Sequence, residues 1–313
     1  MPVNRATPQQ RLRLSSIGIG TYLGNADTAT DVSYTNAIVR AVQLGCNVID
    51  SAANYRFQRS ERSIGAALKI LVEQGFAREK LVICTKGGYL PFDGAPPRNV
   101  REYVNETFVK PGIASFEDIV GGSHCMTPNY LQSQLDQSLR NMGLECVDVY
   151  YVHNPESQLG HVSEAEFYSR LQLAFERLEQ NRTQGKLAFY GVATWNGFRA
   201  AANSGNHHSL VRMVELAREI GGEDHGFRFI QLPFNMAMPE ATTNANETLD
   251  GESVTTVDAA QRLGVTVVAS ASLLQGRIDP QAAIQFAHSN AGITTALIGM
   301  SRVQHVEENL NAD

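Results

Sequence analysis

The chain has 313 residues, of which 43% are hydrophobic and 19% charged, and a net charge of -6. This composition is typical of a soluble globule with a sizeable core, and it argues against a disordered chain. The mild acidity and the lack of clustered Lys and Arg argue against a broad nucleic-acid or anionic-membrane surface. No run approaches the roughly 20 apolar residues that span a bilayer, and the first residues lack the apolar core of a signal peptide. We expect a cytoplasmic protein with reduced thiols, because no close pairing is seen among Cys46, Cys84, Cys125 and Cys146.

Eight short apolar or β-branched runs recur along the chain, each bounded by polar, Gly or Pro residues. They occupy residues 14–21, 46–51, 80–86, 146–153, 187–194, 227–234, 264–272 and 294–300. Segments with apolar residues at helical spacing lie between them, at 33–45, 127–143, 164–182, 209–222, 256–264 and 302–310. Such alternation implies a parallel sheet, and eight strands close as a barrel. We therefore predict an α/β fold in which residues 1–313 form a single (β/α)8 TIM barrel domain.

One connection is much longer than the loops that usually join a strand to the next helix. This long insertion after strand 3, residues 87–127, contains Gly and Pro turns and the aromatic residues Tyr89, Phe92, Tyr103, Phe108 and Phe116. Loops of this length are often functional, and this one has enough apolar surface to fold over the barrel as a lid. The alternative is that this insertion packs on the protein surface, remote from the active site, and takes no part in the chemistry.

Polar residues stand at the ends of three consecutive predicted strands. Asp50, Lys86 and His153 end the second, third and fourth strands, and Tyr55 follows Asp50 by five residues. Active sites of this barrel lie at the carboxyl ends of the strands, and adjacent strands are about 4.8 Å apart. Each residue alone also has a purely structural explanation. Asp50 could cap a helix or turn, Lys86 could be solvated, Tyr55 could pack on the rim, and His153 could be a hydrogen-bonded core histidine. Their corresponding positions on consecutive strands favour one shared site.

These four residue types suit proton transfer to a carbonyl oxygen. A neighbouring cation lowers the pKa of tyrosine, ordinarily near 10, because it stabilises the phenolate. Lys86 can be that cation, and Asp50 can keep Lys86 charged. Tyr55 is then a general acid for a developing alkoxide, and His153 can donate a hydrogen bond to the same oxygen. The residues supply no electrons, so the hydride donor must be a cofactor.

The sequence resembles the aldo-keto reductase family at several points. The strand-end residues lie in DSAANY, ICTKGG and YYVHNP, as in the family's Asp, Tyr, Lys and His tetrad. LGCNVIDSAANY followed by SERSIGAAL is similar to the family signature, and IGIGTYLG resembles its first strand. IGMSRVQHVEENL resembles the segment that holds the adenosine phosphate of NADP. The resemblance covers nearly the whole chain.

This resemblance implies NADPH-dependent reduction of an aldehyde or ketone by direct hydride transfer, with Asp50, Tyr55, Lys86 and His153 as catalytic residues. Gln231 is expected to bind the nicotinamide amide, with sealing of the barrel rim as its alternative role. Trp195 is expected to lie near the cofactor end of the fifth strand. The residues implied to hold NADP are Gly20, Thr21, Tyr22, Asp50, Thr194, Gln231, Ser270, Ala271, Ser272, Leu273, Gly276, Gly299, Ser301, Arg302, His305, Glu308 and Asn309. NAD stays open as an alternative, because Arg302 is the only permanent cation of the terminal segment.

Besides the phosphate segment, where a common lysine is missing and His305 stands in place of Arg, the chain departs from the family pattern at three places. Ser270 stands where the family has an aromatic residue that stacks on the nicotinamide ring. Either another residue covers that ring, for which a residue of 87–127 is the candidate, or the cofactor is held more loosely. Ala193 and Thr194 stand where many family members have a Ser-Asn pair that binds the amide of the cofactor. Asn196 is the candidate to replace a contact that is lost in this way. Little sequence follows Asn309, so we expect the insertion also to replace the C-terminal loop that often lines the substrate pocket.

Two other functions remain open. A Schiff-base lyase could use Lys86 as its nucleophile, although the phosphate-binding segment would then have no purpose. A cofactor-binding regulatory subunit of the same fold is the second alternative. No metal site is predicted, because the adjacent His207 and His208 lack ligand partners at metal-site spacing. The expected partner is a small carbonyl compound, with neither nucleic acid nor membrane.

Overall fold

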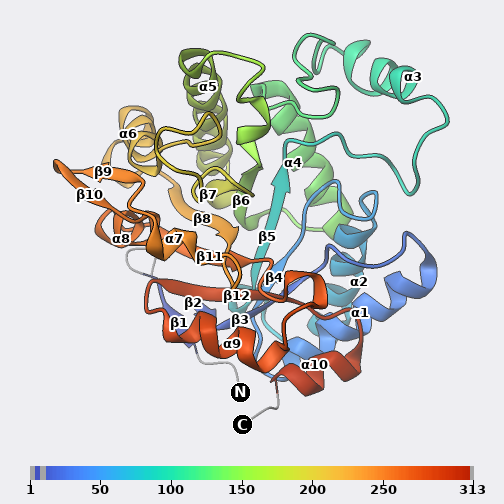
Figure 1. The fold of residues 1–313 in the computed structure, drawn as a ribbon. Helices are drawn as coiled ribbons and strands as arrows, with labels where there is room; N and C mark the ends of the chain where they lie inside the picture. Colours follow the sequence, from blue (N-terminus) through green and yellow to red (C-terminus); the bar gives the residue numbers. More distant parts are fainter. Residues whose placement is uncertain (1–3, 8–11, 311–313) are drawn as a thin grey trace.

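Eight parallel strands close into a barrel in the computed structural model, which describes residues 4–7 and 12–310 (Figure 1). Each strand pairs with the next barrel strand, and β12 closes the ring on β3 with Gly299 opposite Gly20. The strands are β3 (Ile17–Gly20), β4 (Val48–Asp50), β5 (Val82–Gly87), β6 (Val147–His153), β7 (Leu187–Ala193), β8 (Phe227–Pro233), β11 (Thr266–Ser270) and β12 (Ile293–Gly299). The predicted (β/α)8 barrel is confirmed.

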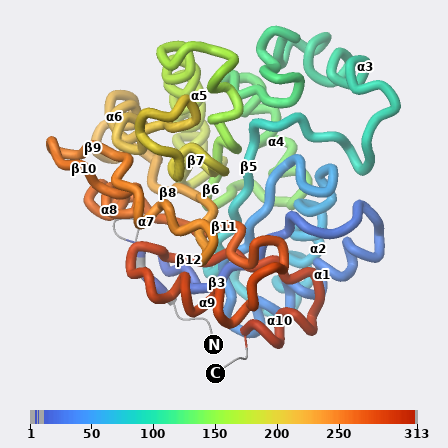
Figure 2. The backbone as a smooth tube through the Cα atoms, viewed as in Figure 1, coloured from blue at the N-terminus to red at the C-terminus, as the bar shows by residue number. Residues whose placement is uncertain are grey.

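A helix follows each barrel strand and packs on the outside of the barrel. These helices are α1 (Thr28–Gln43), α2 (Arg59–Glu73), α4 (Pro128–Met142), α5 (Glu164–Thr183), α6 (Leu210–Gly221), α8 (Thr256–Arg262), α9 (Pro280–Ser289) and α10 (Val303–Leu310). Pro128 begins α4, and Gly143, with φ of 67°, ends it. In Figure 2, α10 lies beside α1, where Ser33 Oγ donates to the Ser301 carbonyl at 2.6 Å.

The barrel strands bury both of their faces. Val48 and Val82 point into the barrel, where they pack with Tyr151 and Phe229. Ile49, the neighbour of Val48, belongs instead to the apolar layer between the barrel and the helices. Because successive side chains alternate between two buried faces, the strands read as continuous apolar runs. Polar residues at the strand ends are therefore exceptions that need a separate explanation.

The first predicted strand, residues 14–21, is two elements. β2 (Arg13–Ser15) pairs antiparallel with β1 (Asn4–Ala6), and only β3 joins the barrel. Leu14 packs in the apolar cluster inside the barrel. The prediction of one continuous strand was wrong, because the chain changes partner at Ser16 and apolar pattern alone does not mark that point.

Several elements lie outside the predicted set. A second antiparallel hairpin consists of β9 (Glu247–Leu249) and β10 (Glu252–Val254), and α7 (Glu240–Thr243) is a single turn. The helices α2 and α9 were also missed. For α2 a signal existed, since Ile64, Leu68 and Leu71 recur at helical spacing and are buried.

Residues 88–127, here called the insertion, connect β5 to α4 and lie to one side of the barrel (Figures 1 and 2). They contain α3 (Val100–Val104) and the π-helical turn η2 (Asn105–Val109). Val104, Phe108 and Cys125 form a small core with Tyr130 of α4. The apolar residues of the insertion thus largely fill a core of its own.

The described residues show no arrangement for a metal ion or a membrane span. All four cysteines are free thiols, three of them buried. No group of three or more His, Cys, Asp or Glu side chains in residues 4–7 and 12–310 could hold a metal ion. Over the same residues, no helix combines the length and apolar character needed to cross a bilayer.

Candidate active site

Asp50 and Lys86 form a buried ion pair at the carboxyl ends of β4 and β5. The Nζ of Lys86 lies 2.5 Å from Oδ1 of Asp50 and donates a second hydrogen bond to the Ser51 carbonyl at 2.7 Å. From β8, Nε2 of Gln231 donates to Oδ2 of Asp50 at 2.8 Å. Lys86 is 1% exposed and Asp50 3%. The pair therefore holds an ammonium group at a fixed place near the barrel mouth.

Tyr55 lies beside this pair on the loop after β4. The Nζ of Lys86 is 5.1 Å from the centroid of the Tyr55 ring. The rings of Tyr22 and His153 approach Tyr55 edge-on, at centroid distances of 5.0 Å and 5.8 Å. The loop turns here because the Tyr55 amide donates to the Ala52 carbonyl at 3.0 Å. The structure thus brings the four predicted catalytic residues together, and their catalytic role stays a prediction.

His153 is held from behind by the insertion. Nε2 of His124 donates to the main-chain carbonyl of His153 at 2.7 Å, and the Tyr89 ring contacts His153 edge-on at 5.1 Å. Gly88, with φ of 145°, permits this approach, since a Cβ there would lie 2.9 Å from both His124 Nε2 and the His153 carbonyl. Sequence reasoning missed this role of His124 because the contact joins residues 29 positions apart.

Burial governs the protonation states of the cluster. Burial alone would lower the pKa of Lys86, but the Asp50 carboxylate raises it above its ordinary value, so Lys86 stays charged. Burial, assisted by the charge of Lys86, lowers the pKa of His153 well below its ordinary value, so this imidazole is neutral. Burial raises the pKa of Tyr55, and Lys86 only partly opposes this. Lys86 lowers the pKa of Tyr55 as predicted, but desolvation of the phenolate outweighs this attraction, so the net shift is upward.

A cavity of about 470 Å³ opens at the carboxyl ends of the strands, with Asp50, Tyr55 and His153 in its wall. Most residues predicted to hold the cofactor line the same cavity, namely Gly20, Thr21, Tyr22, Thr194, Gln231, Ser270, Ala271, Ser272, Leu273, Gly276, Gly299, Ser301, His305, Glu308 and Asn309. Gln275, within the predicted range 270–276, also lines the cavity, and unpredicted wall residues are Leu23, Tyr34, Asn154, Pro280 and Leu297. One cavity therefore joins the cluster around Tyr55 to α10.

Three predicted residues lie differently from expectation. Lys86 is outside the cavity wall, behind Asp50 and Tyr55. Arg302 is exposed and is likewise absent from the described wall. Gln231 lines the cavity, but its amide nitrogen is already bonded to Asp50, which leaves its oxygen for a ligand.

The insertion contributes no residue to the described cavity wall. This wall therefore gives no support to the expectation that residues 87–127 cover the nicotinamide position or line the substrate pocket, which stays a prediction. The insertion buries most of its apolar side chains in its own core, and it contacts the site from outside the wall, behind His153 and at the turn after Tyr55. The aromatic side chains in the wall include Tyr22 and Trp195, 58% and 42% exposed, and Trp195 lies directly after β7.

The cavity wall also presents unused hydrogen-bonding groups. Oγ1 of Thr194 and Oγ of Ser272 are buried and have no partner within the described residues. Nδ1 of His153 is buried and unpaired in the same sense. Buried polar atoms normally find partners, so these atoms fit a polar ligand in the cavity.

The fold and the strand-end cluster define a (β/α)8 barrel with an ionisable site at its carboxyl rim. The chain belongs to the Aldo/keto reductase family, whose pattern matches residues 16–280. The "Putative voltage-gated potassium channel subunit beta" of Schizosaccharomyces pombe is 24% identical over 330 residues, 96% of this chain and 85% of that protein. The NADH-specific methylglyoxal reductase of Escherichia coli is 26% identical over 188 residues, 58% of this chain and 49% of that protein.

Solved structures show the same architecture. A Bacillus halodurans aldo-keto reductase in its holo form has a TM-score of 0.66 at 15% identity, covering 99% of this chain and 90% of that one. A Klebsiella pneumoniae aldo/keto reductase in complex with NADP and acetate has a TM-score of 0.62 at 16% identity, with coverages of 99% and 89%. At these identities the likeness shows the fold.

Proposed function

We propose that this protein is an NADPH-dependent reductase that converts an aldehyde or ketone to an alcohol. The observation that carries the proposal is the placement of Tyr55 in the cavity wall, 5.1 Å from the buried ammonium of Lys86. Asp50 holds that ammonium at 2.5 Å. A proton donor, a fixed cation and a neutral imidazole thus surround one corner of a cavity of ligand size.

Each residue of the cluster has a separate task. Tyr55 donates its proton to the carbonyl oxygen as that oxygen gains negative charge. Lys86 stabilises the tyrosinate that remains, and Asp50 keeps Lys86 charged. His153, neutral and in the cavity wall, donates a ring N–H to the same oxygen and orients it.

The residues of the cavity wall fit a nicotinamide cofactor, which would supply the hydride. The unpaired hydroxyls of Thr194 and Ser272 would hydrogen-bond its polar groups, and Ser301 and His305 would lie at its phosphate end. NADP is supported by the Klebsiella pneumoniae structure that contains it. NAD is the alternative, supported by the Escherichia coli relative that is NADH-specific.

The test uses Trp195, the single tryptophan of the chain, as a reporter in the cavity wall. NADPH and NADH are titrated while the protein fluorescence is followed, and NADPH oxidation is then measured with a panel of aldehydes and ketones. We expect quenching by NADPH and oxidation that depends on a carbonyl compound. Unchanged fluorescence with both nucleotides contradicts the proposal.

A regulatory subunit is the second candidate, favoured by the Schizosaccharomyces pombe relative that aligns with 96% of this chain. Tight NADPH binding without turnover across the whole panel would support it. The lyase alternative is disfavoured, because Lys86 is buried and stays an ammonium ion, which cannot attack a carbonyl. Borohydride treatment with a carbonyl compound should accordingly leave no adduct on Lys86.

A further inference from the structure

Three consecutive residues directly after Tyr55 have a left-handed backbone. Arg56, Phe57 and Gln58 have φ values of 47°, 57° and 69°. This conformation costs free energy for any residue with a Cβ, and glycine is the residue that adopts it freely. Such strain persists only where surrounding contacts over-determine the backbone. Contacts made by these three residues hold the strained backbone in place.

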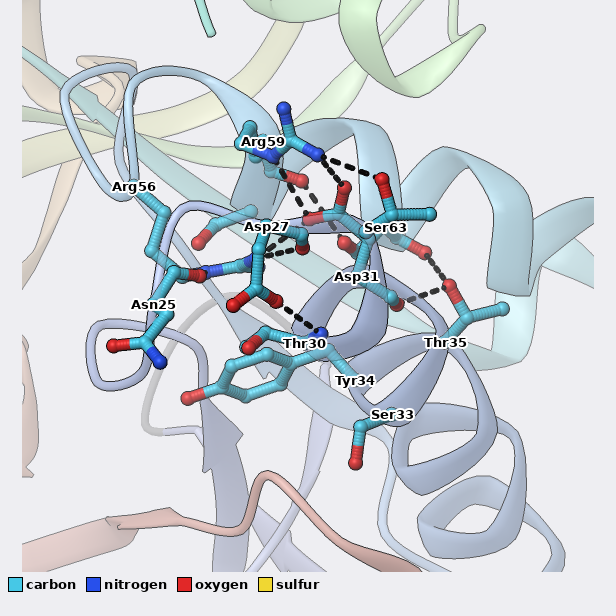
Figure 3. Close-up of polar contacts among 12 residues, drawn as sticks. Asn25, Asp27, Thr30, Asp31, Ser33, Tyr34, Thr35, Arg56, Arg59 and Ser63 are labelled. Atoms are coloured by element: carbon cyan, nitrogen blue, oxygen red, sulfur yellow. Dashed lines mark hydrogen bonds and ion pairs between the residues drawn. The ribbon is translucent and has the colours of Figure 1, made fainter. Parts of the chain in front are cut away.

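Arg56 is tied to the loop that leads from β3 into α1. Its guanidinium donates to the carbonyl of Asn25 at 2.8 Å, to the carbonyl of Asp27 at 3.3 Å and to Oδ1 of Asp31 at 2.5 Å. The side chain is 2% exposed. Its guanidinium carbon also lies 5.3 Å from the centroid of the Tyr34 ring, which lines the cavity. Figure 3 shows Arg56 reaching Asp31 at the start of α1.

The carboxylate of Asp31 binds a second arginine. NH2 of Arg59, in the first turn of α2, donates to Oδ2 at 2.6 Å, while Arg56 occupies Oδ1 (Figure 3). Next to Arg59, Oγ of Ser60 donates to the carbonyl of Thr21 at 2.7 Å. The loop carrying Tyr55 is thus bonded repeatedly to the loop after β3, whose residues Thr21 to Leu23 line the cavity.

The two residues after Arg56 bind the insertion. Nε2 of Gln58 donates to the carbonyl of Phe92 at 3.1 Å, and the amide of Gly94 donates to the carbonyl of Phe57 at 2.9 Å. The rings of Phe57 and Phe92 lie 6.2 Å apart. The strained turn is therefore held on both sides, by the loop after β3 through Arg56 and by the insertion through the next two residues.

We propose that Arg56, bound by Asp31, is a positioning residue that holds the Tyr55 loop against the loop after β3 and so sets the place of the Tyr55 hydroxyl. Arg56 itself lies outside the described cavity wall, and it acts through the backbone of its neighbour. The inference rests on the proposed function, in which Tyr55 is the proton donor. A small displacement of that donor lowers the rate of the chemical step more than it weakens cofactor binding.

The experiment compares Arg56→Gln and Asp31→Asn with Arg62→Gln. Arg62 is a matched control, because it also lies on the first turns of α2 and pairs with Asp93 at 2.6 Å, but at exposed positions. Amide hydrogen exchange, followed by mass spectrometry, measures how readily each of the two loops opens, in peptides 20–31 and 52–62. The turnover number and the Kd of NADPH are measured on the same preparations, well below each Tm.

We expect Arg56→Gln and Asp31→Asn to speed exchange in both loops and to lower kcat by about 10- to 100-fold, with little change in the Kd of NADPH. Arg56→Lys should recover part of kcat, because one ammonium can bind Asp31 but cannot reproduce the forked contacts to Asn25 and Asp27. Arg62→Gln should match wild type in every readout.

The inference is overturned if Arg56→Gln exchanges like wild type in both loops, or if kcat is unchanged while exchange rises. It is also overturned if Arg62→Gln lowers kcat as much as Arg56→Gln, because any ion pair of α2 would then have the same effect. A wild-type protein without turnover on any carbonyl compound overturns the proposed function instead. Hydrogen exchange would still decide whether Arg56 joins the two loops.

Discussion

The ammonium of Lys86 lies 2.5 Å from one carboxylate oxygen of Asp50, and the amide of Gln231 lies 2.8 Å from the other. Both oxygens of a nearly inaccessible carboxylate are therefore satisfied by side chains from β5 and β8. A buried ion pair is costly to assemble, and it adds stability only when its remaining bonds are made. Its presence beside Tyr55 fits the proton-donor role proposed for that tyrosine.

Removing one member of the pair should destabilise the fold more than removing both. Asp50→Asn leaves the Lys86 ammonium buried without its counter-ion, at a cost of about 3 to 5 kcal/mol in the free energy of unfolding. Asp50→Asn combined with Lys86→Met should recover most of that loss and remain without turnover. Urea unfolding at neutral pH measures both variants, and equal instability of the single and double variants would contradict the expectation.

Tyr55→Phe tests the proton donor. The substitution removes the hydroxyl and keeps the ring, so the fold and NADPH binding should be nearly unchanged. Turnover should fall by roughly two to four orders of magnitude, the usual contribution of general acid catalysis. Tyr22→Phe is the matched control, because that ring lies 5.0 Å from Tyr55 and lines the same cavity. Equal losses in the two variants would remove the special role of Tyr55.

The raised pKa of Tyr55 predicts opposite pH profiles for the two directions of reaction. Burial raises this pKa above its ordinary value of 10.0, so the phenol keeps its proton throughout the neutral range. Reduction, which needs the protonated form, should be constant there and decline only as pH rises through the raised pKa. Alcohol oxidation needs the tyrosinate and should rise about tenfold per pH unit below that pKa. A reduction rate that halves near neutrality would assign the proton donor to another group.

His208 should make the stability of the protein sensitive to acid. It is buried against Phe167, both ring nitrogens lack partners among the described residues, and burial lowers its pKa to about 3. The unfolded chain binds a proton near pH 6.5, so stability is complete above that pH and is lost as pH falls toward 3. His208→Phe should reduce the loss between pH 7 and pH 5 by about 2 kcal/mol, as measured by urea unfolding. An unchanged loss would show that His208 is not responsible.

Arg302 tests the choice between NADPH and NADH. Its side chain is exposed, next to Ser301 and near His305 of the cavity wall. If it binds the 2′-phosphate, Arg302→Ala should weaken NADPH by about 10- to 100-fold and leave NADH unchanged. Fluorescence titration of Trp195 with each nucleotide measures this. Equal weakening of the two nucleotides would place the phosphate elsewhere.

Much of the fold could be predicted from local pattern. Strands buried on both faces appear as short apolar runs, and eight such runs alternating with helices indicate the barrel. The carboxyl-end rule then placed Asp50, Lys86 and His153 together, because a residue that ends a parallel strand shares one rim with its neighbours. The antiparallel hairpins were missed, since their three-residue strands are too short for any periodic signal.

The sequence by itself determined the eight-stranded barrel and the meeting of Asp50, Tyr55, Lys86 and His153, because local periodicity and strand ends carry that information. Only the tertiary structure decided that the insertion packs on itself and that the pKa of Tyr55 is raised. It alone also showed that Arg56 is bound by Asp31. The reason is the same in each case: desolvation and contacts between distant segments depend on which surfaces meet, and no local pattern records that.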